Sequence, residues 1–297
     1  KSGQDLEDSR SPEELIAEAV AVAKEADYVI FIGGLNKSAH QDCEDADRKE
    51  LGLSYGQDKV ITALAKANKN LIVVNISGNA IAMPWVKEVP AIVQAWYLGS
   101  EAGSAIASVL TGDVNPSGKL PFTFPASLQD VGAHKLGEYP GTPRNYGSPI
   151  VDQKYNEGIF VGYRWADKEK TKPLFSFGHG LSYTTFAYGK AIADKKVMGQ
   201  DETLTITLPV TNTGSREGSE VIQLYISDLK SSLPRPVKEL KGFSKVKLAP
   251  GETREVTFTI GKEALSFFDD ARHEWVAEPG KFEAWIGASS TDIRNKV

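Results

Sequence analysis

Two hydrophobic periods follow one another along this chain, and they constrain its fold more than any other feature. Up to about residue 115, short apolar runs alternate with segments whose apolar residues recur at helical spacing. That alternation predicts parallel strands joined by helices. From about Phe186 onward, apolar and polar residues alternate one by one, as in strands with one buried face. The sequence therefore predicts an α/β domain followed by an all-β domain.

In the first region we expect strands at 28–32, 71–76 and 91–97, and the first of them is a short, continuous apolar run typical of a buried parallel strand. Helices are expected at 57–67 and 101–110, and another after Ser11. Ser11 is a good capping residue, Pro12 suits a first helical turn, and the acids that follow suit the positive end of the helix dipole. An open sheet with mainly parallel strands follows from this order.

The loop after the first expected strand contains four carboxylates, at Asp42, Glu44, Asp45 and Asp47. Carboxylates this close repel one another, so they must be spread apart, paired with cations or kept partly protonated. In a solvated acidic loop the carboxylates are spread apart, whereas a general acid is a carboxyl group that stays protonated. Binding sites of open α/β sheets lie at the carboxyl ends of the strands, where this loop stands. Its position therefore favours a functional site.

The hydrophobic period is lost between about residues 115 and 182, where Pro, Gly and aromatic residues are frequent. We expect this stretch to pack against the domains, since a segment so rich in aromatics is not typical of disorder. Strands with Pro/Gly turns then fill the rest of the chain, which is typical of a β-sandwich. The expected divisions are an α/β domain at 1–150, an aromatic connector at 151–189 and a β-sandwich at 190–297.

Composition excludes several classes of protein. The net charge of −5 and the lack of a basic cluster argue against nucleic acid as a partner. No apolar run reaches the roughly 18 residues that a membrane-spanning helix needs. Cys43 is the one cysteine and the four histidines lie far apart, so neither a disulfide, a metal site nor another cofactor is expected. No signal peptide is visible at the start of the sequence.

Six sequence motifs, in this order, resemble the C-terminal part of glycoside hydrolase family 3, the β-glucosidase family. They are E-x-x-D-R (44–48), QAWY-x-G-x-E-x-G (94–103), GDVNPSGKLP (112–121), Y-x-EGIFVGYR (155–164), FGHGLSY (177–183) and RP-x-KELKGF (235–243). The resemblance covers nearly the whole chain. It implies an (α/β)6-type sandwich domain followed by a fibronectin-III-like sandwich. It also implies an N-terminal (β/α)8 barrel, which this sequence does not contain.

The resemblance implies a retaining, exo-acting β-glycosidase, most similar to a β-glucosidase that hydrolyses terminal β-D-glucosyl residues. Glu44 matches the general acid/base of the family, whereas the aspartate nucleophile belongs to the barrel. The family often writes this segment E-G-x-D-R, but here Asp45 replaces the glycine. His40, Asp45 and Arg48 are candidates for contacts to the substrate. The resemblance further implies a β-linked substrate, a barrel partner, and a periplasmic or secreted location.

Other functions stay open at this point. A β-xylosidase of the same family is one, because the residues that select the sugar belong to the barrel. A non-catalytic carbohydrate-binding or accessory subunit is another. Glu157, in the connector, is a second candidate acid, although a buried structural pair with Arg164 explains it better. Trp275 and Trp285 form no clear aromatic row, so we expect the sandwich to be a structural support.

Overall fold

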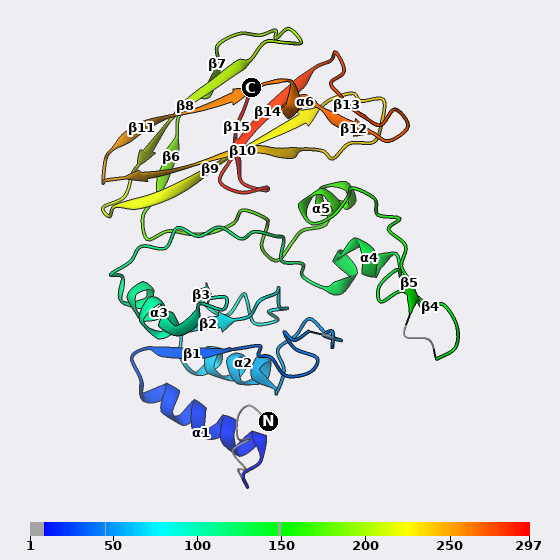
Figure 1. Ribbon diagram of the computed structural model, residues 1–297. Coiled ribbons are helices and arrows are strands. Elements are labelled where there is room, and N and C mark those ends of the chain that lie inside the picture. Colours follow the sequence, from blue (N-terminus) through cyan, green and yellow to red (C-terminus); the bar gives the residue numbers. More distant parts are fainter. Residues whose placement is uncertain (1–8, 45, 148–149) are drawn as a thin grey trace. The chain divides into compact units, whose positions relative to one another are not determined.

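The computed structural model describes residues 9–44, 46–147 and 150–297. The chain separates into two compact units, residues 1–106 and 107–297 (Figure 1). The first unit contains the parallel sheet, and the second contains the β-sandwich. Helix α3 begins in the first unit and ends in the second. The domain limits expected at residues 150 and 189 stay a prediction.

The first unit is built on a parallel sheet with strand order β1-β2-β3. Its elements are α1 (Pro12–Glu25), β1 (Val29–Gly34), α2 (Gln57–Ala67), β2 (Leu71–Ile76), β3 (Ala91–Gln94), a 3-10 turn (Gly99–Glu101) and α3 (Ala102–Thr111). A capping box starts α1, where Ser11 and Glu14 each accept a hydrogen bond from the other's backbone N–H. The predicted parallel α/β class is confirmed. The described residues supply three strands to this sheet, against the six that the (α/β)6 name implies.

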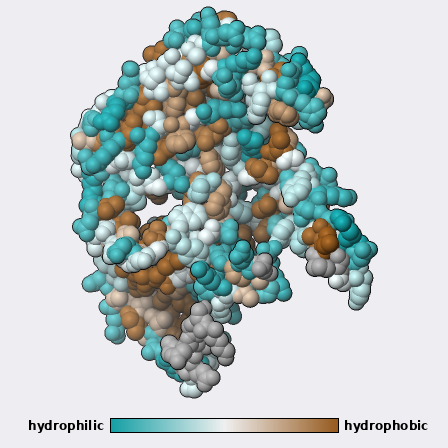
Figure 2. Space-filling model, viewed as in Figure 1, coloured by the Kyte–Doolittle hydropathy of each residue, from teal (hydrophilic) through white to brown (hydrophobic). Residues whose placement is uncertain are grey.

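Strand β2 lies at the centre of the sheet, and Leu71, Val73 and Val74 are buried. Strand β1 is different, because Ile30 and Ile32 are 49% and 58% exposed. Figure 2 shows apolar residues gathered over the part of the first unit that holds β1. The β1 edge of one face of the sheet is thus an uncovered apolar surface, while Val74 of β2, which is paired with Ile32, is buried. Isoleucines at alternate positions of a strand normally face a core.

Two strand boundaries differ from the prediction. Strand β1 extends to Gly34 because a side chain there would place its Cβ 1.9 Å from the Ile76 carbonyl oxygen, so only glycine allows the approach to β2. Strand β3 ends at Gln94 instead of Tyr97. Trp96 has a φ of 57°, a left-handed conformation that no strand can contain. The apolar run 91–97 shows no sign of this turn.

The second unit contains two antiparallel sheets packed around one core, which confirms the predicted sandwich (Figure 1). Its strands are β6 (Phe186–Tyr188), β7 (Ile192–Ala193), β8 (Leu204–Asn212), β9 (Gly218–Asp228), β10 (Glu239–Leu248), β11 (Thr253–Ile260), β14 (Phe282–Gly287) and β15 (Ile293–Lys296). The sheet orders are β10-β9-β14-β15 and β11-β8-β6, and β7 pairs with β8. Alternate residues of β8, such as Ile206, Leu208 and Val210, are buried in the core. A short helix α6 (Lys262–Leu265) and the pair β12 (Phe267–Asp269) and β13 (Glu274–Val276) complete it.

The described part of the aromatic stretch before the sandwich contacts the sandwich. It contains a 3-10 turn (Leu128–Asp130), α4 (Gly132–Lys135), β4 (Thr142–Pro143), β5 (Val151–Asp152) and α5 (Tyr163–Glu169). Helix α5 is tied to β10 by two contacts. The Leu240 N–H donates to the Tyr163 hydroxyl at 2.9 Å, and Lys238, buried, pairs with Asp167.

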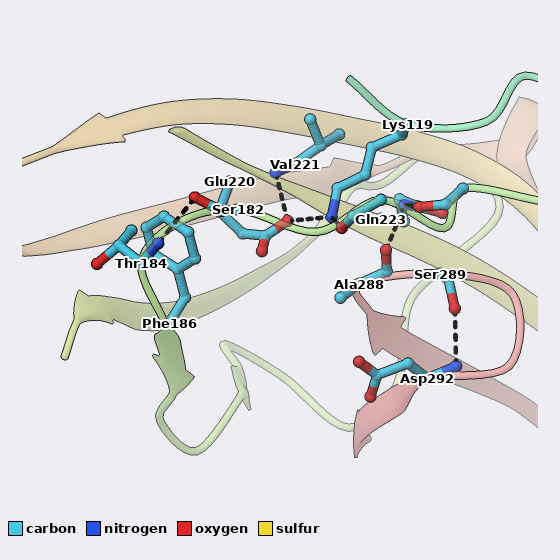
Figure 3. Close-up of polar contacts among 12 residues, drawn as sticks. Lys119, Ser182, Thr184, Phe186, Glu220, Val221, Gln223, Ala288, Ser289 and Asp292 are labelled. Carbon is cyan, nitrogen blue, oxygen red and sulfur yellow. Dashed lines mark hydrogen bonds and ion pairs between the residues drawn. The ribbon is translucent and has the colours of Figure 1, made fainter. Parts of the chain in front are cut away.

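A nearly buried polar network joins two of the sequence motifs to the sandwich (Figure 3). The Lys119 Nζ lies 2.9 Å from Glu220 Oε1 and donates to the Gly180 carbonyl at 2.8 Å. The side chains of Lys119 and Glu220 are 13% and 8% exposed. Gln223 on β9 donates to the carbonyls of Gly178 and Ala288. The GDVNPSGKLP and FGHGLSY motifs therefore have a structural role in this unit.

None of the helices in the described ranges is long and apolar enough to span a membrane. Within the same ranges, no group of three or more His, Cys, Asp or Glu side chains is arranged to hold a metal ion.

Candidate active site

The acidic loop follows β1 and folds back on itself. The side chain of Gln41 is buried, and its Oε1 accepts a hydrogen bond from the Asn36 N–H at 3.2 Å. The Asp42 N–H donates to the Asn36 carbonyl at 3.0 Å, and the His40 N–H donates to the Ala46 carbonyl at 3.1 Å. These contacts give the loop a defined conformation, which a freely solvated acidic turn would lack.

Asp42 connects this loop to the loops that follow the other two strands. Its carboxylate accepts hydrogen bonds from the Gly78 N–H at 2.6 Å, the Tyr97 hydroxyl at 2.9 Å and the Asn79 amide at 3.3 Å. Gly78 and Asn79 follow β2, and Tyr97 follows β3. Loops after all three parallel strands therefore meet at one edge, as the strand order predicts. Sequence reasoning included Asp42 in the acidic cluster but did not assign it this role.

Tyr97 is a neutral hydrogen-bond donor at this edge. Burial of the phenol and its hydrogen bond to Asp42 raise the pKa of Tyr97 to about 12. The hydroxyl therefore stays protonated at neutral pH, and it donates a hydrogen bond to the Asp42 carboxylate. The left-handed turn at Trp96 comes directly before Tyr97 in the chain.

Arg48, a predicted substrate contact, lies half-buried at the end of the acidic cluster. Its Nη2 donates to the Ala80 carbonyl at 2.6 Å, while Nη1 is buried and has no hydrogen-bond partner within the described residues. Burial lowers the pKa of Arg48, and the negative charge of Asp42 opposes this change. A guanidinium nevertheless stays protonated in proteins, so Arg48 brings a positive charge and a donor without a partner to the site.

An open cavity of about 390 Å³ lies between these groups. Its walls are more polar than apolar, and all come from the first unit: Gln41, Asp42, Cys43, Asp47, Arg48, Gly78, Asn79 and Tyr97. Carboxylate, amide, guanidinium and phenol groups around a cavity can bind the hydroxyl groups of a polar ligand.

The other predicted residues have different positions. Glu44 is exposed, and it follows Cys43, which lines the cavity. His40 is exposed and has a φ of 64°, and its Nδ1 lies 3.0 Å from the Asp47 carbonyl oxygen. It lines a smaller cavity, which Arg48 also borders. Asp45 lies outside the described residues, so its predicted contact has no structural account.

Glu157, the second candidate acid, is buried in the second unit, 7% exposed. Its Oε2 has no hydrogen-bond partner within the described residues, so the expected pair with Arg164 is not formed. Gly132 makes room for it, because a Cβ there would lie 3.2 Å from the Cβ of Glu157 and 3.1 Å from the Trp165 ring. Glu157 and the Trp165 ring thus both lie against the backbone at Gly132, and neither of the two cavities described here borders Glu157.

Comparison with known proteins assigns the chain to a family. The family model described as "Glycosyl hydrolase family 3 C-terminal domain" matches residues 3–183, and the "Fibronectin type III-like domain" model matches residues 220–290. Beta-glucosidase BoGH3A of Bacteroides ovatus is 54% identical over 94% of this chain, and thermostable beta-glucosidase B of Acetivibrio thermocellus is 40% identical over 98%.

The solved structures agree with the sequence relatives. A crystal structure of beta-glucosidase from Kluyveromyces marxianus in complex with glucose matches 98% of the chain, with a TM-score of 0.86 and 38% identity. The chain spans 37% of the length of the two relatives above and 34% of that structure. The family model covers well over half of the chain, and the strand order and sandwich fit it. The chain therefore belongs to glycosyl hydrolase family 3, whose C-terminal domain it carries.

Proposed function

We propose that the whole protein is a retaining, exo-acting β-glycosidase, with Glu44 as its general acid/base. The activity is most similar to that of a β-glucosidase, because the relatives above carry that name. The observation that most supports Glu44 as the general acid/base is its position in the fold. It is an exposed carboxyl on the loop after β1, where the loops of three parallel strands meet beside a polar cavity.

A retaining mechanism needs a second carboxylate about 5–5.5 Å from the acid/base, to attack the sugar. Asp42 is the neighbour to consider, since it is two residues from Glu44. Its oxygens already accept hydrogen bonds from Gly78, Asn79 and Tyr97, which stabilise the carboxylate and make it a poor nucleophile. The nucleophile of our proposal is therefore an aspartate on a barrel domain outside this chain.

The exposure of Glu44 fits a role that is completed only when another domain and a substrate cover the loop. Desolvation raises the pKa of a carboxyl group, which then holds its proton until it protonates the leaving oxygen. In the second step the same group would take a proton from the attacking water. The nucleophile of this proposal lies outside the chain, so the chain by itself is expected to be inactive.

Substrate contacts on the leaving-group side are part of the proposal. Arg48 lines the cavity, and His40 and Asp45 belong to the same loop. These three residues would contact the group that leaves. No cofactor enters the mechanism, because two carboxyl groups and water suffice.

The exposed apolar side chains of β1 are an argument for a large partner domain. Ile30 and Ile32 are exposed, and the chain accounts for 37% of the length of its relatives. The missing strands and the barrel would bury these side chains in the whole protein. The domain limits at 150 and 189, which rest on the hydrophobic period, and the periplasmic or secreted location, which rests on the family resemblance, belong to the same proposal.

The decisive experiment compares this chain with the complete protein on aryl β-glucosides. We expect no turnover from the chain and turnover from the complete protein. In the complete protein, Glu44→Gln should lower kcat by about 100- to 10,000-fold on a substrate with a poor leaving group, as loss of a general acid does. A 2,4-dinitrophenyl glucoside needs no acid and should still be cleaved in the first step. Added azide should then speed turnover.

The matched control is Glu88→Gln, an exposed glutamate of the first unit that should behave like the unchanged protein. Unchanged activity of Glu44→Gln on the poor leaving group would overturn the assignment. A complete protein that binds glucosides without cleaving any would support an accessory subunit instead. The same panel with aryl β-xylosides tests the β-xylosidase alternative.

A further inference from the structure

The two ends of the segment that carries Glu44 are held by one short stretch of chain after β2. On one side, Asp42 accepts hydrogen bonds from the Gly78 N–H at 2.6 Å and the Asn79 amide at 3.3 Å. On the other side, Arg48 donates to the Ala80 carbonyl at 2.6 Å. Residues 78–80 therefore fix the chain on both sides of Glu44, at positions six residues apart in the sequence.

A third contact reaches Asp42 from the next strand. The Tyr97 hydroxyl donates to the same carboxylate oxygen as the Gly78 N–H does, at 2.9 Å. The backbone reaches Tyr97 through the left-handed Trp96, a conformation that a bulky residue adopts only when its surroundings favour it. The neutral state of the Tyr97 phenol matches a permanent donor role.

The negative charges of the loop explain why these contacts to Asp42 and Arg48 are needed. The segment contains four carboxylates, and their mutual repulsion favours an open loop. Three donors and the nearby positive charge of Arg48 compensate the charge of Asp42, which removes one carboxylate from that repulsion. Glu44, two residues away, is left exposed on a loop whose ends cannot move far.

We propose that Asp42 is a positioning residue, which holds the Glu44 loop in its working orientation through Gly78, Asn79 and Tyr97. The inference rests on the proposed function, because it concerns how Glu44 is presented to the substrate. Asp42 does not touch the reacting atoms. Its effect is on the geometry of proton transfer, which is sensitive to displacements of about 1 Å.

The first test needs no activity and uses the chain itself. Hydrogen exchange of the Gly78 amide and of the amides in 36–44 is measured in the unchanged chain, in Asp42→Asn and in Tyr97→Phe. We expect at least about a 10-fold faster exchange in Asp42→Asn and a smaller increase in Tyr97→Phe, since one contact of three is lost. Asp201→Asn, an exposed aspartate of the second unit, is the matched control and should leave these rates unchanged.

The second test uses the complete protein. Asp42→Asn should lower kcat on a poor leaving group by roughly 10- to 100-fold, with little change in KM and little change on the 2,4-dinitrophenyl glucoside. Tyr97→Phe should show the same pattern more weakly. A purely structural defect would instead lower kcat on both substrates by a similar factor, and it would shift the melting temperature.

The outcomes separate the two proposals. If Glu44→Gln keeps full activity, the proposed function fails, whatever the exchange rates show. If Glu44→Gln loses activity while Asp42→Asn keeps both its exchange rates and its leaving-group dependence, the positioning role fails. Faster exchange together with a selective loss on poor leaving groups supports it.

Discussion

The molecule contains two clusters of oppositely charged side chains that differ in how deeply they are buried. Around Lys119 and Glu220, opposite charges lie 2.9 Å apart and both side chains are nearly buried. Around Asp42 and Arg48, the groups border an open cavity, and Glu44 is exposed. A buried charge must be paired to be tolerated, whereas a charge that acts on a ligand must stay accessible. The first cluster therefore holds the fold, and the second is available for chemistry.

The largest expected effect on stability comes from breaking the Lys119–Glu220 pair. Lys119→Met leaves the Glu220 carboxylate buried without its cation, which should lower the free energy of unfolding by about 3–5 kcal/mol. Urea unfolding of the chain, followed by circular dichroism, measures the change. Lys247→Met is the matched control, because Lys247 pairs with Glu217 in the open and should cost at most about 1 kcal/mol. Equal losses in the two variants would contradict the distinction.

Acidic pH should weaken the same buried network through His179. Burial and the positive charge of Lys119 lower the pKa of His179, and Asp292 opposes this change. The unfolded chain then binds a proton near the ordinary value of about 6.5, before the folded chain does. The free energy of unfolding should consequently fall as pH drops below about 6.5.

Unfolding by urea at pH 8.0, 6.5 and 5.5 checks this dependence. In His179→Gln the pH slope between 6.5 and 5.5 should become shallower. His273→Gln, at an exposed position, should keep the slope of the unchanged chain. A slope that is identical in all three proteins would show that His179 is not responsible.

Removing a buried hydroxyl that lacks a hydrogen-bond partner should leave the stability of a protein unchanged or increase it. The Tyr188 hydroxyl is buried and lacks a hydrogen-bond partner within the ranges that the structure describes. Tyr188→Phe should therefore raise the free energy of unfolding by up to about 1 kcal/mol. Tyr225→Phe is the contrast, because the Tyr225 hydroxyl donates to Gln223 Oε1 at 2.5 Å and its loss should lower stability by about 1 kcal/mol. Calorimetric melting of both variants tests whether the two signs differ.

The smallest effect is expected at the open cluster. Glu44→Gln should change the free energy of unfolding by less than about 0.5 kcal/mol, because its side chain is exposed. Urea unfolding of the chain measures it beside Lys119→Met. A loss of several kcal/mol would mean that Glu44 stabilises the fold. The difference in role between the two clusters would then be wrong.

Much of the architecture was predictable because it depends on local patterns. The period of apolar residues predicts β2 and α2 with their observed limits, and the signature at Ser11–Glu14 predicts the start of α1. The alternation in 204–210 predicts the buried face of β8. The carboxyl-end rule also locates the acidic loop at the correct edge of the sheet. The failure at β3 has a local cause as well, since the left-handed turn at Trp96 leaves no trace in an apolar run.

The sequence by itself thus determined the two fold classes, the loop and, through family motifs, the choice of Glu44. Only the tertiary structure showed that three donors hold the Asp42 carboxylate. Those donors lie 36, 37 and 55 residues further along the chain. No local pattern encodes such contacts, because they exist only once three parallel strands bring their carboxyl ends together. The same reason hides the Lys119–Glu220 pair, which forms only when a loop and strand β9 meet.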